Sequence, residues 1–337
     1  MAVDALVPND PRVEHKFTTA GGFKYYYMLA KPAGKPAATV LLIHGWPDLA
    51  MGWRYQVPFL LSLNLQVIVP DMLGYGYTDA PDSYKEYSFK KQASYVASIV
   101  REVTDEPIIL GGHDWGGAFI WRMALYHPEL IRAIFSICVP FIPPSPKVVT
   151  LQDSVKRFPQ FRYQIQFSEG IAERMVGKSP ERLRRFFNGI FGGKTPEGRD
   201  VWTAEDGLDE ESLERVGPSP MVGQDIIEHY AKVYSERGLH GPCNWYRLRE
   251  VNSEEELPLA NKDIRFKIPA MLVMAENDTA LLPSMADGQE KYFEAGLKKE
   301  LIPKCSHWAM VQKPEETNRL IGEFVQSVLG TSIKPAL

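Results

Sequence analysis

A glycine-rich turn in the first half of the chain limits what this sequence can fold into. The heptapeptide at 111–117, Gly-Gly-His-Asp-Trp-Gly-Gly, follows the apolar run 107–110 and precedes the helical pattern 118–126. Glycine at 112 and at 116 predicts a sharp strand-to-helix turn, in which Asp114 has a sparsely populated backbone conformation. The turn should therefore project the Asp114 carboxylate from the edge of a sheet, beside the positive end of a helix.

The pattern Gly112-x-Asp114-x-Gly116 predicts a nucleophile elbow that carries aspartate where serine is commoner. A carboxylate that attacks an acyl carbon gives an anhydride, whereas attack on an electrophilic saturated carbon gives an ordinary ester. The predicted substrate therefore has a leaving group on saturated carbon. The alternative, an acidic N-cap at a glycine-rich helix start, is less favoured because strand, glycines and helix all agree.

The order of apolar segments predicts an α/β fold. Short β-branched runs, typical of strands buried on both faces of a parallel sheet, lie at 39–43, 65–69, 107–110, 131–138 and 268–275. Helices are expected at 53–63, 88–104, 284–295 and 314–329, an edge strand at 23–31 and a short strand at 299–302. This alternation indicates a doubly wound, mostly parallel sheet.

The middle of the chain has a different sequence pattern, because no β-branched run appears between residues 139 and 266. Helix boundary signals appear there instead, including Ser179-Pro180 at a start and Gly223 before the pattern 226–237. We therefore expect a core domain made of residues 1–140 and 267–337, with a helical cap, or lid, inserted at 141–266.

Composition excludes several classes of partner. The chain has 337 residues, 45% of them apolar and 24% charged, and a net charge of −4, so neither nucleic acid nor an anionic membrane is expected as a partner. Three widely spaced cysteines, Cys138, Cys243 and Cys305, form neither a disulfide framework nor a metal-ligand pattern. With no basic apolar leader in residues 1–11, a reducing, cytoplasmic location is expected.

An ester on Asp114 needs a base that activates water for its hydrolysis. His307 is the best candidate, because it lies in the loop after the last predicted strand, downstream of the nucleophile. A carboxylate must hold the tautomer of that base, and Asp278, which follows the strand ending at Ala275, is favoured over its neighbour Glu276. No metal and no cofactor is required by this set.

The oxyanion formed during hydrolysis needs backbone N–H donors. Trp115, directly after the nucleophile, should supply one, and Trp46 in His44-Gly45-Trp46-Pro47, at the end of an earlier strand, the other. A cis bond before Pro47 would turn the Trp46 amide inward, whereas the competing interpretation is a simple strand-ending turn.

Taken together, these motifs resemble the soluble epoxide hydrolases of the α/β-hydrolase superfamily over nearly the whole chain. The residues that carry the resemblance are His44–Pro47, Trp53–Gln56, Asp71 with Gly74–Gly76 and Asp79–Pro81, Gly112–Gly117, Tyr163-Gln164, Asn244–Arg247, Ala275–Asp278 and Ser306–Trp308. Cys305 is a departure, since glycine often precedes the serine-histidine pair.

The resemblance implies an α/β-hydrolase core with a helical cap, and two cap tyrosines that donate hydrogen bonds to the epoxide oxygen. Those tyrosines match Tyr163 and Tyr246. Phenols suit this task because they stay protonated at neutral pH yet can stabilise an alkoxide. The substrate would be a small apolar epoxide in a pocket lined by Trp46, Trp115 and Trp308, and water the second reactant.

Two rival functions remain. A haloalkane or haloacid dehalogenase uses the same aspartyl ester, and the indole of Trp115 could bind a departing halide; the two tyrosine donors favour the epoxide, because a halide needs no proton. A receptor on the same fold would bind its ligand without turnover.

Overall fold

An eight-stranded sheet forms the centre of the computed structural model, which describes residues 3–260 and 262–330. Its strands are β1 (Val13–Ala20), β2 (Phe23–Ala30), β3 (Ala38–Ile43), β4 (Leu65–Pro70), β5 (Ile108–His113), β6 (Ile131–Ile137), β9 (Ala270–Ala275) and β10 (Leu297–Ile302). They lie in the order β1-β2-β4-β3-β5-β6-β9-β10, antiparallel at β1/β2 and β2/β4 and parallel elsewhere. The predicted α/β class with a mostly parallel sheet is confirmed.

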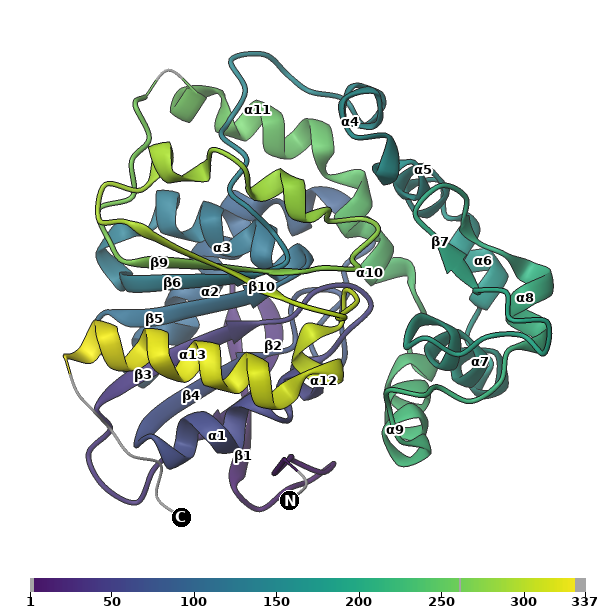
Figure 1. Ribbon diagram of the computed structural model, residues 1–337, viewed down its shortest axis with the longest axis horizontal. Coiled ribbons are helices and arrows are strands. Elements are labelled where there is room, and N and C mark those ends of the chain that lie inside the picture. Colours follow the sequence, from purple (N-terminus) through teal and green to yellow (C-terminus); the bar gives the residue numbers. More distant parts are fainter. Residues whose placement is uncertain (1–2, 261, 331–337) are drawn as a thin grey trace. The chain divides into compact units, whose positions relative to one another are not determined.

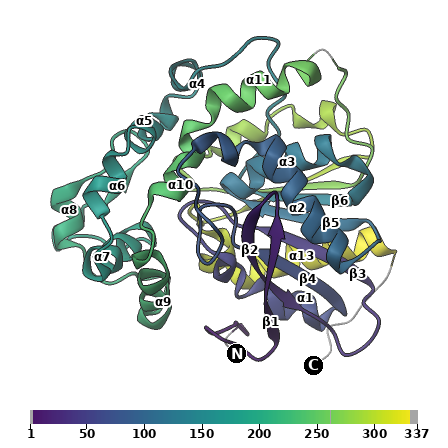
Figure 2. The ribbon, with the colours of Figure 1, turned by 180° about the vertical axis from the view of Figure 1, so that it is seen from behind.

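Helices cover both faces of this sheet. Figures 1 and 2 show α1 (Gln56–Ser62) and α13 (Pro314–Leu329) on one face, and α2 (Phe89–Val103) and α3 (Trp115–Tyr126) on the other. The strands between them are apolar and fully buried: every residue of β4, β5 and β9 is inaccessible to solvent or nearly so. Burial on both faces explains why these strands appear in the sequence as continuous apolar runs.

The described residues divide into two compact units. The sheet unit contains the described parts of Met1–Met72, Phe89–Pro143 and Lys262–Leu337, and the helical unit contains Leu73–Ser88 and the described part of Pro144–Asn261. The grouping differs from the expected one at 73–88, which packs with the helical unit. Trp245 donates its indole N–H to the Leu73 carbonyl at 3.1 Å, and Arg237 donates to the Thr78 carbonyl at 2.6 Å.

The helical unit is built from short helices. They are α4 (Leu151–Arg157), α5 (Tyr163–Ser168), α6 (Ile171–Val176), α7 (Pro180–Ile190), α8 (Glu210–Arg215), α9 (Gln224–Ser235), α10 (His240–Asn244) and α11 (Arg249–Ala260). The predicted start at Ser179-Pro180 is confirmed, and α7 buries one face through Leu183, Phe186 and Phe187. Two short strands, β7 (Trp202–Thr203) and β8 (Gly207–Leu208), form a hairpin that the sequence did not predict.

Two elements of the sheet unit differ from their predictions. Residues 284–295 do not form a helix but two 3₁₀ turns, Pro283–Ala286 and Gln289–Tyr292, separated by Gly288 at φ 67°. The strand at 23–31 is not at the edge, because the more polar β1 lies outside it. Only the first and last residues of β1 are buried, so its apolar signal is weak.

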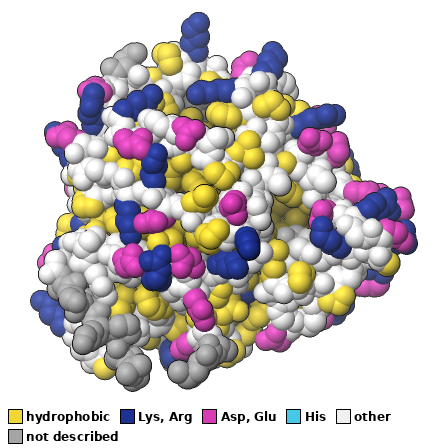
Figure 3. All heavy atoms as spheres, viewed as in Figure 1, with side chains coloured by type: hydrophobic (Ala, Val, Ile, Leu, Met, Phe, Trp, Pro, Cys, Tyr) yellow, Lys and Arg dark blue, Asp and Glu magenta, His cyan; other side chains and the backbone are white. Residues whose placement is uncertain are grey.

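The surface carries mixed charges. On the face drawn in Figure 3, basic and acidic side chains are interspersed, in keeping with the small net charge of −4. Among the described residues, no helix has both the length and the apolar character needed to cross a membrane.

Candidate active site

Asp114 lies at the turn between β5 and α3. Its backbone has φ 52° and ψ −126°, a conformation that L-residues rarely adopt. The surrounding glycines are required sterically: a Cβ on Gly116 would be 2.3 Å from the Ile43 carbonyl oxygen, and one on Gly112 would be 2.5 Å from the Gly116 carbonyl oxygen. The sharp strand-to-helix turn predicted from the spacing of these glycines is therefore present.

Backbone amides face the Asp114 carboxylate from two loops. The Trp46 N–H donates to Oδ1 at 2.7 Å, and the Trp115 amide also hydrogen-bonds to this carboxylate. The Trp46–Pro47 peptide bond is cis, as the sequence analysis considered. Gly45 lets the two loops approach, since a Cβ there would be 2.4 Å from the Asp114 Cβ. Two backbone N–H donors, one from each loop, thus face this carboxylate.

His307 lies between two carboxylates. Its Nδ1 is 2.7 Å from Asp278 Oδ2, and its Nε2 is 3.6 Å from Asp114 Oδ2. The other oxygen of Asp278 accepts the N–H groups of Ala280 at 3.0 Å and Leu281 at 2.9 Å, which fixes this buried carboxylate. The imidazole is thus held by one acid with its second nitrogen directed at the other.

Glu276, the rival of Asp278, has a different environment. It is exposed, and its Oε2 accepts the Lys304 N–H at 2.7 Å. The structure therefore brings Asp278, and not Glu276, to His307.

The three groups perturb one another's protonation. Burial raises the pKa of Asp114, partly offset by the charge of His307 and the Trp46 and Trp115 amides. Burial alone would lower the pKa of His307, but the hydrogen-bonded Asp278 and the charge of Asp114 raise it to about 9. Burial opposes ionisation of Asp278, yet His307 and the two amides bring its pKa below the usual value. Ionised Asp114 and Asp278 thus favour imidazolium in the resting site.

Two neutral histidines support these residues, and the sequence did not single them out. His113 is fully buried, and its Nε2 donates to the carbonyl oxygen of His307 at 2.8 Å; burial and the charge of His307 lower its pKa to about 3. His44 accepts the Met72 N–H on Nε2 at 3.0 Å and donates from Nδ1 to the Gly45 carbonyl at 2.9 Å. Burial lowers the pKa of His44 to about 4. Their position inside the motifs that contain Gly45 and Asp114 was the available signal.

Cys138 directly follows β6. It has φ 67°, and its buried thiol is 3.6 Å from the His307 carbonyl oxygen. With His113 and His307 it forms a group whose donor atoms lie within 4.8 Å of one another. This set suits a metal poorly, because His113 donates its Nε2 proton to a carbonyl, His307 is held by Asp278 through Nδ1, and burial raises the pKa of the thiol.

The two tyrosines suggested by the resemblance lie side by side in the helical unit. Tyr163 begins α5 and Tyr246 lies in the 3₁₀ turn Trp245–Arg247; their ring centroids are 6.0 Å apart at 75°. Both are buried, and Phe167 packs edge-on against each of them, at 5.4 and 5.0 Å. Two segments about 80 residues apart in the chain thus present a pair of phenols.

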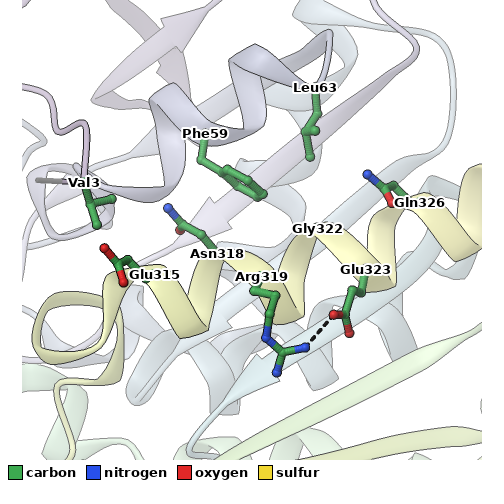
Figure 4. A pocket seen from close by; sticks show the side chains of 9 residues that line it. All are labelled: Val3, Phe59, Leu63, Glu315, Asn318, Arg319, Gly322, Glu323 and Gln326. Atoms are coloured by element: carbon green, nitrogen blue, oxygen red, sulfur yellow. Dashed lines mark hydrogen bonds and ion pairs between the residues drawn. The ribbon is translucent and has the colours of Figure 1, made fainter. Parts of the chain in front are cut away.

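The predicted pocket tryptophans lie near the catalytic candidates. Trp46 and Trp115 supply the amides described above, and the Trp308 ring packs against His307 at 5.3 Å between centroids. A separate groove between α1 and α13 has Phe59, Leu63 and Gly322 in its lining and contains none of the catalytic candidates (Figure 4).

Changing Asp278 to asparagine should separate its role from that of Glu276. We expect Asp278→Asn to lower turnover by about 10³- to 10⁴-fold, because an amide cannot stabilise the imidazolium and favours the wrong tautomer. Glu276→Gln, a matched change in the same loop, should stay within about twofold of wild type. The measurement is steady-state turnover of an epoxide by both variants. Equal losses would contradict the assignment of Asp278.

Comparisons with known proteins agree with this geometry. The alpha/beta hydrolase fold family model matches residues 38–314. The chain is 50% identical to epoxide hydrolase srdG of Neurospora crassa, over 98% of this chain and 100% of that protein. It is 33% identical to the bifunctional epoxide hydrolase 2 of Sus scrofa, over 89% of this chain but only 55% of that longer protein. The crystal structure of an epoxide hydrolase from Vigna radiata superposes with a TM-score of 0.81 at 24% identity, covering 94% of this chain and 98% of that one.

The sheet, the turn at Asp114 and the family match define the chain as an α/β-hydrolase. Within that superfamily it belongs to the epoxide hydrolases and is an enzyme, as the 50% identity to a curated member over nearly the whole chain shows.

Proposed function

We propose that the protein hydrolyses a small apolar epoxide to a vicinal diol through a covalent ester on Asp114. In the first step Oδ2 of Asp114 attacks a ring carbon, and the bond between that carbon and the epoxide oxygen breaks. Tyr163 and Tyr246 donate hydrogen bonds to the epoxide oxygen, which leaves as an alkoxide and takes a proton from one phenol. The two rings lie 6.0 Å apart, which suits donation to one shared oxygen.

Once the ester has formed, the imidazolium of His307 gives its proton through water to the tyrosinate left by the first step. In the second step the neutral imidazole takes a proton from water, and the resulting hydroxide attacks the ester carbonyl carbon. The oxyanion that forms on Oδ1 is held by the amides of Trp46 and Trp115, each worth on the order of 3 kcal/mol. Asp278 stabilises the imidazolium. Collapse of the tetrahedral intermediate breaks the bond between the carboxyl carbon and Oδ2; the departing alkoxide takes the proton of the added hydroxyl group and leaves as the diol, and His307 is again an imidazolium.

The observation that carries the proposal is the spacing around His307. Its Nδ1 is hydrogen-bonded to Asp278, while 3.6 Å separates its Nε2 from Asp114 Oδ2, so this nitrogen is free to act on a water beside the ester. The charge balance fits both steps: esterification removes the negative charge of Asp114, one of the groups that raise the pKa of His307. His307 therefore becomes a better proton acceptor only after the ester has formed.

The remaining assignments follow from the same chemistry. The helical unit would act as the cap that carries the phenols, and Trp46, Trp115 and Trp308 would line the apolar part of the pocket. Neither step calls for a metal or an organic cofactor. All three cysteines are buried free thiols, which supports work in a reducing compartment such as the cytoplasm.

Parallel incubation with an epoxide and a matched chloroalkane tests this proposal against its rivals. We expect diol from the epoxide and a rate of chloride release at least about 100-fold lower, because the phenol pair is suited to an alkoxide that must be protonated. Diol is measured by chromatography and chloride by ion-selective electrode. Chloride without diol would indicate a dehalogenase, and binding without either product would indicate a receptor.

A single turnover in ¹⁸O-labelled water tests the covalent route directly. With enzyme in excess, attack of water on the ester carbonyl should place the label in the Asp114 carboxylate and not in the diol. Direct attack of water on the epoxide would instead label the diol.

A further inference from the structure

Arg247 follows Tyr246 directly and connects three segments of the helical unit. Its Nε donates to the Ser168 carbonyl oxygen at 2.9 Å, its Nη1 donates to Asn244 Oδ1 at 2.6 Å, and its Nη2 pairs with Glu173 Oε1. The side chains of Arg247 and Glu173 are each only 19% exposed. All three nitrogens of the guanidinium are thus engaged, in a largely buried position.

These contacts connect the two segments that carry the phenols. Ser168 is the last residue of α5, whose first residue is Tyr163, and Arg247 belongs to the same 3₁₀ turn as Tyr246. The guanidinium therefore ties the carboxyl end of the Tyr163 helix to the Tyr246 turn. Phe167, one residue before Ser168, packs against both tyrosine rings and transmits this restraint to them.

Two nearby residues of the helical unit, Gly170 and His240, also contact the Arg247–Glu173 pair. Gly170, at φ 72°, makes the turn from α5 to α6, and a Cβ there would be 3.2 Å from Arg247 Nη2. His240 holds the second oxygen of Glu173, with 3.0 Å between Nδ1 and Oε2. Other Arg–Glu pairs of this unit are far more exposed: Arg184 and Glu228, which join α7 and α9, are 42% and 57% exposed.

The geometry points to Arg247, braced by Glu173, as the residue that positions Tyr163 and Tyr246 for proton donation to the opening epoxide. Arg247 acts through the tyrosines and is a positioning residue. The planar guanidinium group of Arg247 donates to three acceptors in fixed directions, and the single ammonium group of lysine cannot reproduce this arrangement. The inference rests on the proposed function and adds that donor alignment in the ester-forming step depends on this group.

Rapid-quench kinetics with enzyme in excess tests the inference, because loss of epoxide and appearance of diol report ester formation and ester hydrolysis separately. Arg247→Gln should slow ester formation by about 10- to 100-fold, part of the full value of a positioned acid. Hydrolysis of the ester, which uses His307, should change by less than about twofold. Arg247→Lys should lose nearly as much as Arg247→Gln. Arg184→Gln, the exposed control, should leave both steps unchanged.

A double-mutant cycle excludes a merely structural effect. In a Tyr163→Phe, Tyr246→Phe background, Arg247→Gln should add less than about threefold to the loss, because the groups that it positions are gone. An undiminished loss in that background, or equal loss in both steps, would overturn the inference. If Arg247→Gln does not fold by circular dichroism, Glu173→Gln, which removes a single acceptor, replaces it in the same cycle.

The controls also distinguish a failure of this inference from a failure of the proposed epoxide hydrolysis. Wild-type protein that forms neither ester nor diol would contradict the proposed function itself. Slow ester formation in the tyrosine variants, together with normal ester formation in the Arg247 variants, would overturn only the role of Arg247.

Discussion

Asp114→Ala should lower diol formation by at least about 10⁴-fold, the largest effect expected of any single change in this protein. Alanine has no atom that can bond to the epoxide carbon, so the covalent route is closed and only slow background attack by water remains. The backbone at φ 52° also disfavours alanine, so folding must be checked by circular dichroism. Diol formation is followed by chromatography over long incubations.

The control for this change is an exposed aspartate of the same unit. Asp287→Ala should keep turnover within about twofold of wild type. Mass spectrometry adds a second measurement: wild-type protein quenched during turnover should carry an adduct on the peptide containing Asp114, and Asp114→Ala should carry none. Residual turnover of Asp114→Ala near the wild-type rate would contradict a nucleophilic role.

His307→Gln should stall the enzyme at the ester. Glutamine cannot take the proton from water, so hydrolysis should slow by about 10³- to 10⁴-fold while ester formation continues. The protein should therefore gain the mass of one intact epoxide molecule per chain, located at Asp114 by peptide mapping. Absence of any adduct, in a variant that has lost turnover, would count against the covalent route.

The pH dependence of the wild-type hydrolysis step provides an independent check on His307. The base must be neutral to accept a proton, and the pKa of His307 in the resting site is about 9. Esterification of Asp114 removes one charge that raises this pKa, so hydrolysis should accelerate with rising pH and level off below pH 9. The acceleration should be absent in His307→Gln. A wild-type hydrolysis rate that falls between pH 6 and pH 9 would contradict the assignment.

Local sequence rules were sufficient for the elbow because its requirements are steric. Gly112 and Gly116 are needed because a Cβ at either position would lie within 2.5 Å of a backbone oxygen. The spacing of the two glycines in the sequence is enough to predict this need. The buried strands were equally visible, since burial on both faces requires continuous apolar runs. The loops that carry His307 and Asp278 followed from chain order, once the nucleophile was placed.

Contacts between distant segments could not be predicted in this way. The choice between Asp278 and Glu276 depends on which side chain turns inward; position in the loop favoured Asp278, but only the contacts of the two side chains show it. His113 and His44 were quoted as parts of motifs but given no role, because neither takes part in the chemistry that those motifs predict. The prediction of a helix at 284–295 was wrong, because Gly288 has a left-handed backbone conformation that separates two short turns. Arg247 became visible only through its three acceptors.

The inclusion of residues 73–88 in the helical unit matters for protein engineering. A chimaera that exchanged only 144–260 for the corresponding segment of a relative would take the Leu73 and Thr78 carbonyls from one parent and the side chains that bind them from the other. It would also separate Gly74 from Gly241, which pack so closely that a Cβ on Gly241 would be 2.5 Å from the Gly74 oxygen. Recombination libraries should therefore inherit both segments from one parent, with crossover points placed at 72/73, 88/89, 143/144 and 261/262.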